Sequence, residues 1–296
     1  MTGTMAPVDD QADSSQTLDP ASPLHFNASI FYMKPDPLYN VEKPYFMNIP
    51  LDPTWVPKLK QTNVAYTRKT VAITDIRGHE DVFTLDQSGF ELGTLRTGLS
   101  YDDFAKTDTI VSRFYDEVKV FLKQYTGAAE VLPFDFQVRR KDPTLPPNSR
   151  GAPGKAQPFA AVHGDQTTKA AIRRLKYFHP IFAEKYADGR FQIINVWKPL
   201  RGPVYNSPLA VCDYRTVKQD DLPNANHRFY YVNGQETHEA WMIKCFDSAT
   251  ATDPKIAQFS PHVSFPYTRP GPGSAKWEDS IPRESVEVRS FVFRHS

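Results

Sequence analysis

Along most of the chain, hydrophobic and polar residues alternate in short runs, which is the pattern of β-strands that bury one face. Turn-forming residues separate these runs, and 26 prolines among the 296 residues favour irregular connections. The runs that predict strands are residues 28–33, 69–75, 131–138, 191–197, 208–212, 229–232, 240–246 and 285–293, and residues 83–92 predict a further extended piece. The chain is therefore predicted to be mainly β.

Two stretches depart from this alternation and carry apolar residues at helical spacing. Residues 102–125 form the stronger prediction, with Gly127 as the stop, and residues 169–186 form the second, which ends at Gly189. Many short strands with two helices predict a double-sheet jelly roll with flanking helices. A β-sandwich of another topology fits the same pattern. We expect one domain over residues 23–296, preceded by a disordered acidic tail at 1–22.

Charge and cysteine content narrow the classes of function. The 35 basic residues nearly equal the 34 acidic ones, which argues against general nucleic-acid binding. No apolar run reaches the roughly 20 residues that span a bilayer, so we expect no membrane segment. Cys212 and Cys245 are the only cysteines, which disfavours a disulfide framework and favours a reducing compartment, the cytoplasm. The basic run at 139–141 is interpreted as a solvated face.

The residues with the clearest chemistry are His163 and Asp165, which one glycine separates. Side chains two apart on an extended backbone share a face, so the imidazole and the carboxylate can reach one point together. A second histidine would complete a 2-His-1-carboxylate triad, which holds Fe(II) and leaves three coordination positions open. The pair alone also fits a hydrogen-bonded surface pair, so the prediction depends on residues downstream.

His262 is the preferred second histidine. It follows Pro261 in a short segment that we expect to be extended. His238, just before the strand predicted at 240–246, is the alternative. The residues after His262 favour it over His238, because they lead to a strand whose side chains could bind a dicarboxylate.

This last strand carries two candidate arginines. Arg283 and Ser285 share strand parity, and an arginine with a neighbouring hydroxyl can bind a carboxylate through a two-pronged contact and one further donor. Arg289 has the same parity and is the second candidate. We expect one of the two arginines to form an ion pair with a nearby carboxylate instead. On the strand at 191–197, Asn195 is a candidate for co-substrate binding, whereas Trp197 is expected to pack in the core.

Taken together, these motifs make the chain resemble the Fe(II)/2-oxoglutarate-dependent oxygenases. The branch it resembles contains fungal gibberellin desaturase-like and aspergillic-acid-pathway hydroxylase/desaturase-like proteins, with cephem-methoxylase relatives. The matching segments are residues 162–167, 195–200, 202–204, 208–213, 261–262 and 283–289. None of them identifies a substrate.

The resemblance implies a double-stranded β-helix, which is a jelly roll, with His163, Asp165 and His262 as iron ligands. It implies 2-oxoglutarate as co-substrate, held at its far end by Arg283 or Arg289, and dioxygen as oxidant. The implied reaction is hydroxylation, desaturation or cyclisation of a small molecule, as in fungal secondary metabolism. The loop at 141–157 and the proline-rich N-terminal segments are candidates for a lid.

Two other classes of function share this scaffold. One is a jelly-roll module that binds a small molecule without catalysis, and the other is a cupin-like metal hydrolase or isomerase. Neither needs an arginine and a serine on the last strand to hold a dicarboxylate, so these two residues discriminate between the classes.

Overall fold

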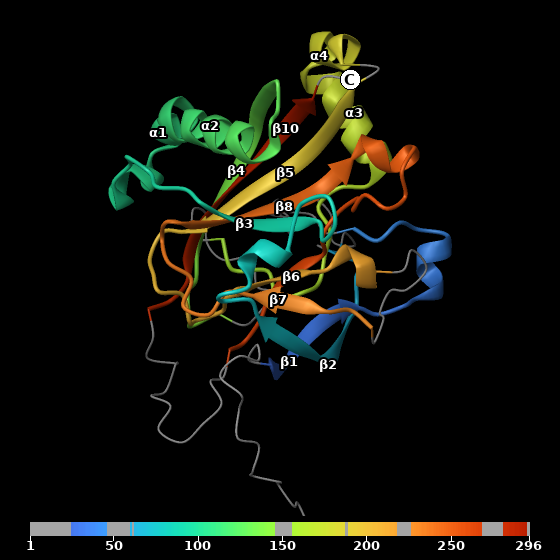
Figure 1. Cartoon of the computed structure of the whole chain (residues 1–296). Coiled ribbons are helices and arrows are strands. Elements are labelled where there is room, and N and C mark those ends of the chain that lie inside the picture. The colour runs from blue at the N-terminus through green and yellow to red at the C-terminus, as the bar shows by residue number, and fades with distance from the viewer. Residues whose placement is uncertain are drawn as a thin grey trace, which may run out of the picture.

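The computed structural model describes residues 25–45, 60, 62–145, 156–186, 189–217, 226–267 and 281–294. The tail predicted at 1–22 lies outside these residues, and so does most of the loop predicted at 141–157. Figure 1 shows α1 and α2 on one face of a β-sheet, a second sheet on its other face, and α3 and α4 at one end of the first sheet. The prediction of a mainly β fold with flanking helices is confirmed.

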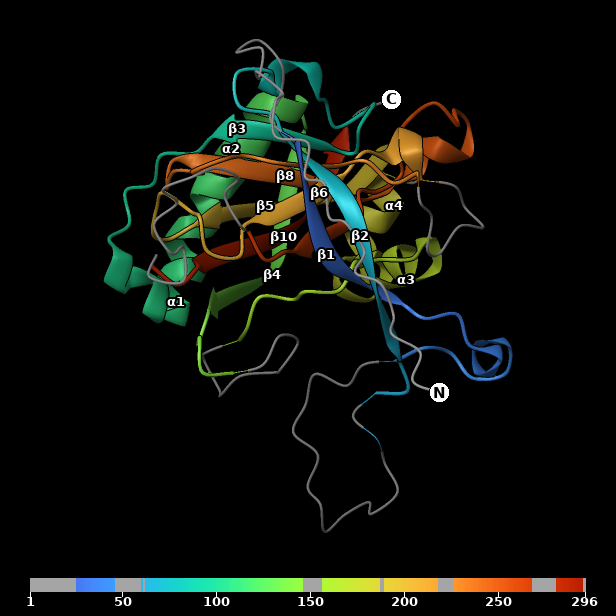
Figure 2. The ribbon, with the colours of Figure 1, turned by 90° about the horizontal axis from the view of Figure 1, so that it is seen from below.

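Ten strands in the described residues pair into two five-stranded sheets. The major sheet has the order β3 (Phe90–Thr94), β8 (Glu239–Asp247), β5 (Arg190–Pro199), β10 (Glu284–Arg294) and β4 (Glu130–Arg140). The minor sheet has the order β1 (His25–Met33), β2 (Tyr66–Asp75), β7 (Phe229–Tyr231), β6 (Leu209–Cys212) and β9 (His262–Ser264). From β5 to β10 the chain passes repeatedly between the two sheets, as in a jelly roll. Seen from below, β1 and β2 cross the strands of the major sheet (Figure 2).

Each of the eight strands predicted from the alternation is present, with ends shifted by a few residues. The extended piece predicted at 83–92 is wrong over most of its length, because residues 85–88 form a turn and β3 begins only at Phe90. Gly89 ends this turn with a φ of 82°. A Cβ at this position would lie 2.8 Å from the carbonyl oxygen of Phe259, so both the backbone angle and the close approach require glycine.

Helices are present where they were predicted, but neither predicted stretch forms one continuous α-helix. The helices are α1 (Thr107–Thr109), α2 (Tyr115–Thr126), α3 (Thr168–Phe178) and α4 (Pro180–Lys185), with a π-helical turn at Ile110–Phe114 and 3₁₀ turns at Pro37–Asn40, Glu80–Val82, Tyr101–Ala105, Tyr214–Thr216 and Ser248–Ala251. Gly127 stops α2 with a φ of 64°, as expected. The helix predicted at 169–186 is two helices, since Pro180 disfavours a helical backbone at His179 before it.

The major sheet separates two apolar layers. Its outer face, with Val196, Val286 and Val288, packs against α2. Its inner face, with Trp197 and Trp241, packs against strands of the minor sheet. Because side chains alternate along a strand, the odd-numbered residues of β10 up to 289 point into the space between the sheets.

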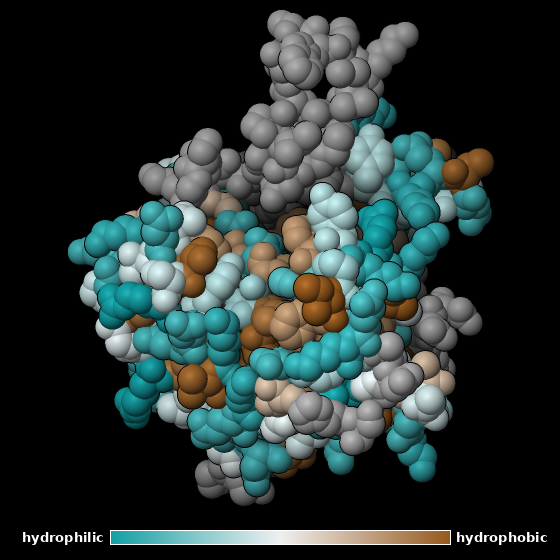
Figure 3. Space-filling model, turned by 90° about the horizontal axis from the view of Figure 1, so that it is seen from above, coloured by the Kyte–Doolittle hydropathy of each residue, from teal (hydrophilic) through white to brown (hydrophobic). Residues whose placement is uncertain are grey.

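The side of the molecule that carries the helices is mostly hydrophilic, with apolar side chains exposed among the polar ones (Figure 3). Phe178 and Ile181, at the corner between α3 and α4, are among the exposed apolar residues. No helix in the described part of the chain is long and apolar enough to cross a membrane.

Candidate metal centre

His163, Asp165 and His262 meet between the sheets, with one ligand atom from each lying within 4.8 Å of the others. The Nε2 atom of His163 is 3.6 Å from Oδ1 of Asp165, and the Nε2 atom of His262 is 3.8 Å from the same oxygen. Among the described residues no other such group of three potential metal ligands is found. His238, the alternative second histidine, is not part of the group.

The backbone brings the two histidines together. His163 donates its N–H to the carbonyl of His262 at 3.2 Å, and His262 donates back to the carbonyl of His163 at 2.9 Å. The segment before α3 therefore lies against β9 as an antiparallel bridge, which places the two rings 4.3 Å apart, centre to centre. These two backbone hydrogen bonds hold together histidines that lie far apart in the sequence.

Both imidazoles are prepared to accept a metal at Nε2. The Nδ1 atom of His163 is 2.9 Å from the carbonyl oxygen of Ala161, and that of His262 is 3.1 Å from the carbonyl oxygen of Ser260. A carbonyl only accepts, so each Nδ1 carries a proton, and Nε2 is the nitrogen through which each neutral ring could bind a metal. Burial, with His262 nearby, lowers the pKa of His163 to about 3 despite Asp165, so this ring is neutral at pH 7.

The two oxygens of Asp165 have different surroundings. Oδ2 accepts hydrogen bonds from Nδ2 of Asn195 at 2.7 Å and from Nε of Arg289 at 3.1 Å. Oδ1 faces the two imidazoles. Burial alone would raise the pKa of Asp165, but the two histidines, Arg289 and the hydrogen bond from Asn195 outweigh it and hold the pKa well below its usual range. Two neutral imidazoles and one carboxylate are a donor set that suits Fe(II).

Arg289 forms ion pairs with several carboxylates. Besides Asp165, it binds Oδ2 of Asp135 through Nη1 at 3.0 Å and Oε1 of Glu287 through Nη2 at 2.5 Å. The strand register explains the arrangement, because Asp135 of β4 and Asn195 of β5 lie directly opposite Arg289 on its two sides. The expectation that one of the two arginines forms an ion pair is confirmed for Arg289.

No carboxylate of the described residues forms an ion pair with Arg283. Its side chain is buried, and Nη1 donates to the carbonyl of Ser207 at 2.8 Å while the guanidinium lies 5.4 Å from the centre of the Trp197 ring. The Nε–H is buried and has no hydrogen-bond partner among the described residues. Burial and the charge of Arg139 lower the pKa of Arg283 to about 9, despite Glu287. Ser285, buried on the same face, lies two residues further along.

The interpretation of residues 139–141 as one solvated face is wrong, because strand alternation divides them. Arg140 points outward and binds Oε2 of Glu284 through Nε at 3.0 Å. Arg139 points between the sheets, where Nη1 donates to the carbonyl of Gln157 at 2.8 Å. Lys141 donates to the side chains of Asn206 and Ser207. The period of two in the strand predicted at 131–138, extended by two residues, is the signal that separates Arg139 from Arg140.

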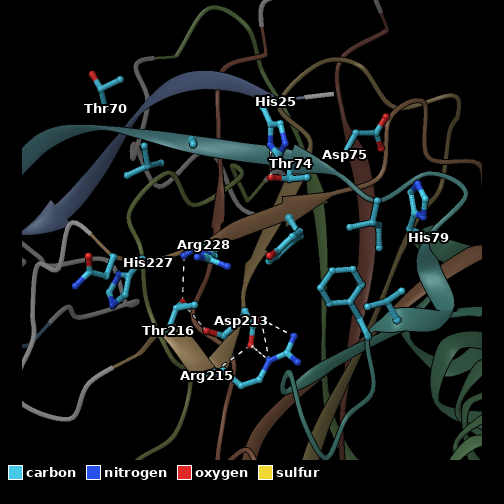
Figure 4. A pocket seen from close by; sticks show the side chains of 17 residues that line it. His25, Thr70, Thr74, Asp75, His79, Asp213, Arg215, Thr216, His227 and Arg228 are labelled. Atoms are coloured by element: carbon cyan, nitrogen blue, oxygen red, sulfur yellow. Dashed lines mark hydrogen bonds and ion pairs between the residues drawn. The ribbon is translucent and has the colours of Figure 1, made fainter. Parts of the chain in front are cut away.

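A hollow of about 1200 Å³ lies elsewhere, beside the exposed part of β2 (Figure 4). Thr74 and Asp75 line one side of it, and Asp213, paired with Arg215 at 2.7 Å, lines another. None of the three candidate metal ligands borders this hollow, and neither does Arg283. It is therefore not the space in which the metal centre acts.

Comparison with protein families gives one match that spans most of the chain. A family model described as an oxidoreductase/YMDC permease-like domain matches residues 30–226 and 221–293. The description mentions a permease, but no helix in the described part of the chain is long and apolar enough to cross a membrane.

Curated relatives and solved structures are more specific. The hydroxylase/desaturase CTB9 of Cercospora beticola is 30% identical over an alignment that covers 99% of this chain and 98% of the relative. The hydroxylase/desaturase efuI of Hormonema carpetanum is 28% identical over 78% of this chain and 86% of the relative. The solved structure of the iron and α-ketoglutarate-dependent endoperoxidase NvfI, a protein of Aspergillus novofumigatus, superimposes with a TM-score of 0.76 and 27% identity, covering 93% of this chain and all of that one.

Proposed function

The chain belongs to the hydroxylase/desaturase family of Fe(II)/2-oxoglutarate-dependent oxygenases, and on this premise we propose that His163, Asp165 and His262 bind its iron. The observation that carries the assignment is the convergence of the two Nε2 atoms and Oδ1 of Asp165, while both Nδ1 atoms donate to backbone carbonyls. The protein is thus an oxidoreductase that requires Fe(II), 2-oxoglutarate and dioxygen. When bound, the iron activates dioxygen at the expense of 2-oxoglutarate, which is converted to succinate and carbon dioxide.

Arg283 and Ser285 are the proposed binding residues for the distal carboxylate of 2-oxoglutarate. A buried guanidinium with an unused Nε–H needs an anionic acceptor, and a carboxylate can take two parallel hydrogen bonds from it. Ser285 shares its face of β10 and supplies a hydroxyl. The ring of Trp197 beside the guanidinium limits access of water to this end of the site.

Arg289 and Asn195 are then positioning residues for Asp165 instead of co-substrate ligands. Because both donate to Oδ2, only Oδ1 of Asp165 remains for the metal. A carboxylate that uses one oxygen leaves three of six coordination positions open, which is enough for the two oxygens of 2-oxoglutarate and for dioxygen. Arg289 is in turn held by Asp135 and Glu287, so the carboxylate stays in one orientation.

The substrate is proposed to be a small organic molecule of fungal secondary metabolism. The names of the relatives CTB9 and efuI refer to hydroxylation and desaturation, and that of NvfI refers to endoperoxide formation. These outcomes share the oxidation of a C–H bond and differ in how the substrate lies. A binding module or a metal hydrolase would not need the buried Arg283, and this residue favours the oxygenase.

We also propose that residues 23–296 form a single domain in the cytoplasm. Apolar clusters that contain residues of both sheets support the single domain. The buried free thiols of Cys212 and Cys245, together with a ferrous centre, suit a reducing compartment. Fluorescence microscopy of the tagged protein in a fungal host tests the location.

Anaerobic addition of Fe(II) and 2-oxoglutarate to the purified protein tests the assignment of the iron ligands. We expect a weak visible charge-transfer band, and succinate once air is admitted together with a substrate. His163→Ala and His262→Ala should each remove the band. His238→Ala is the matched control and should keep it, and a band that disappears with His238 but survives without His262 would contradict the proposed triad.

A further inference from the structure

Arg139 is placed by the register of β4 against β10. It lies directly opposite Ser285, and the next pair along, Lys141 and Arg283, is joined by a hydrogen bond of 2.9 Å from the N–H of Lys141 to the carbonyl of Arg283. Val138, the preceding residue, packs against the outer core beneath α2. Arg139 therefore points inward, as a diagonal neighbour of Arg283 on the same face of the sheet.

Neither of these two arginines forms an ion pair within the described residues. Arg139 donates to the carbonyl of Gln157, and Arg283 donates to the carbonyl of Ser207. The carboxylates nearest to them, Asp165 and Glu287, are already bound by Arg289 and by Asn195. A backbone carbonyl satisfies a donor but does not neutralise a charge. A buried guanidinium at Arg283 and a half-buried one at Arg139, on the same face of the sheet, consequently favour an anionic ligand.

The strand register indicates where Arg139 lies along this face of the sheet. Arg139 is level with Ser285, between the levels of Arg283 and Arg289 on β10. Arg289 in turn donates to Oδ2 of Asp165. Arg139 is thus placed between the end of the face that holds Asp165 and the end that holds Arg283.

We propose that Arg139 is a second 2-oxoglutarate-binding arginine, which holds the carboxylate next to the keto group while Arg283 holds the distal carboxylate. This inference rests on the proposed function. The two arginines then divide a dianion between them: Arg139 orients the keto-acid end beside the metal ligands, and Arg283 and Ser285 fix the far end. The co-substrate would thus be bound by a positive charge at each end.

Calorimetric titration of the Ni(II)-loaded protein under nitrogen separates the two roles, since it measures binding without turnover. Two ligands are used: 2-oxoglutarate, and 2-oxobutanoate, which has the keto-acid end but no distal carboxylate. We expect Arg139→Met to weaken both ligands by a similar factor, about 10- to 100-fold for the loss of a charged, two-pronged contact. Arg283→Met should weaken 2-oxoglutarate by a comparable factor and leave 2-oxobutanoate unchanged.

Arg140→Met is the matched control, because Arg140 is the neighbour of Arg139 on the opposite face and pairs with Glu284. It should bind both ligands as the unaltered protein does. Arg139→Lys keeps the charge with a single donor group and should give an intermediate affinity for both ligands. Thermal unfolding of the metal-free variants identifies any loss of the fold, and the lysine variant preserves the test if the methionine variant does not fold.

Two results would overturn the assignment. If Arg139→Met and Arg139→Lys bind 2-oxoglutarate as tightly as the unaltered protein, Arg139 only supports the carbonyl of Gln157. If they lose affinity for 2-oxoglutarate but not for 2-oxobutanoate, Arg139 acts on the distal carboxylate instead. Failure of the unaltered, Ni(II)-loaded protein to bind 2-oxoglutarate would instead count against the proposed function.

Discussion

Two groups of ionisable side chains lie at least partly buried, and they differ in how completely their members satisfy one another. The first, which we term the ion cluster, consists of Asp86, Arg190, Lys244 and Asp247. Lys244 donates to Asp86 at 2.9 Å and to Asp247 at 2.6 Å, and Arg190 contacts both oxygens of each carboxylate. Two cations face two anions, and every carboxylate oxygen accepts a hydrogen bond.

The second group is the proposed metal centre of His163, Asp165 and His262. Here the Nε2 atoms and Oδ1 converge, while the hydrogen bonds of the three side chains within the described residues are made at the outward atoms Nδ1 and Oδ2. This contrast indicates that the two groups have different roles. A polar cluster that satisfies itself stabilises the fold, whereas buried acceptors that face one another need a cation from outside.

The largest expected effect is that of Asp165→Ala on the reaction. Loss of the only carboxylate among the three ligands should reduce succinate formation to the background without enzyme, because the metal is no longer held. Asp116→Ala, at an exposed position of α2, is the control and should retain activity. If the comparison is right, Asp165→Ala lowers the free energy of unfolding of the metal-free protein less than a substitution in the ion cluster does.

That substitution is Lys244→Met, which removes one of the two cations that bind the buried Asp247 and the partly exposed Asp86. We expect the free energy of unfolding to fall by about 3–5 kcal/mol, as when one partner of a buried ion pair is removed. Denaturant unfolding measures this change. Lys119→Met, which removes an exposed pair with Asp116, should cost about 1 kcal/mol or less. Similar losses for the two lysines would show that the ion cluster contributes no more than a surface pair.

A smaller effect is expected for Asn195→Ala, which removes one of the two donors to Oδ2 of Asp165. Loss of a residue that orients a metal ligand typically weakens metal binding about 10- to 100-fold. Titration with Co(II), followed by its visible absorption, measures the affinity. Unchanged Co(II) affinity would mean that Arg289 alone orients the carboxylate.

The smallest effect is a dependence of stability on pH that belongs to the ion cluster. Burial alone would raise the pKa of Asp86 and of Asp247, but hydrogen bonds and charge from Arg190 and Lys244 outweigh it and lower both pKa values. Since the folded-state pKa is the lower one, this contribution is present above the unfolded value of about 3.9 and is lost as the pH falls below it.

Denaturant unfolding of the metal-free protein measures this loss. The measurements run from about pH 5 to about pH 3, roughly one unit on either side of the unfolded pKa of an aspartate. Other carboxylates also titrate there, so the informative quantity is the difference between the unaltered protein and Lys244→Met. The variant should lose less stability over this interval. An equal loss in both proteins would show that Lys244 does not hold these two carboxylates in the charged form.

Local pattern was enough to predict the strands and to single out the three residues that meet in the proposed metal centre. The parity of His163 and Asp165 and the extended segment at His262 are properties of a few neighbouring residues. The same parity could not distinguish Arg283 from Arg289, since both point to the same side of β10. Their difference comes from what lies across the sheet: Asp135 and Asn195 flank Arg289, and no described carboxylate flanks Arg283.

The sequence by itself determined which residues share a face, because alternation along a strand is a local consequence of backbone geometry. It thereby determined the mainly β fold and the pairing of imidazole with carboxylate. The tertiary structure alone decided which charges are already neutralised, because that depends on strands paired across long separations in the chain. This is why Arg289 binds Asp165, why Arg283 has no carboxylate partner among the described residues, and why Arg139, within a run of three basic residues, points between the sheets.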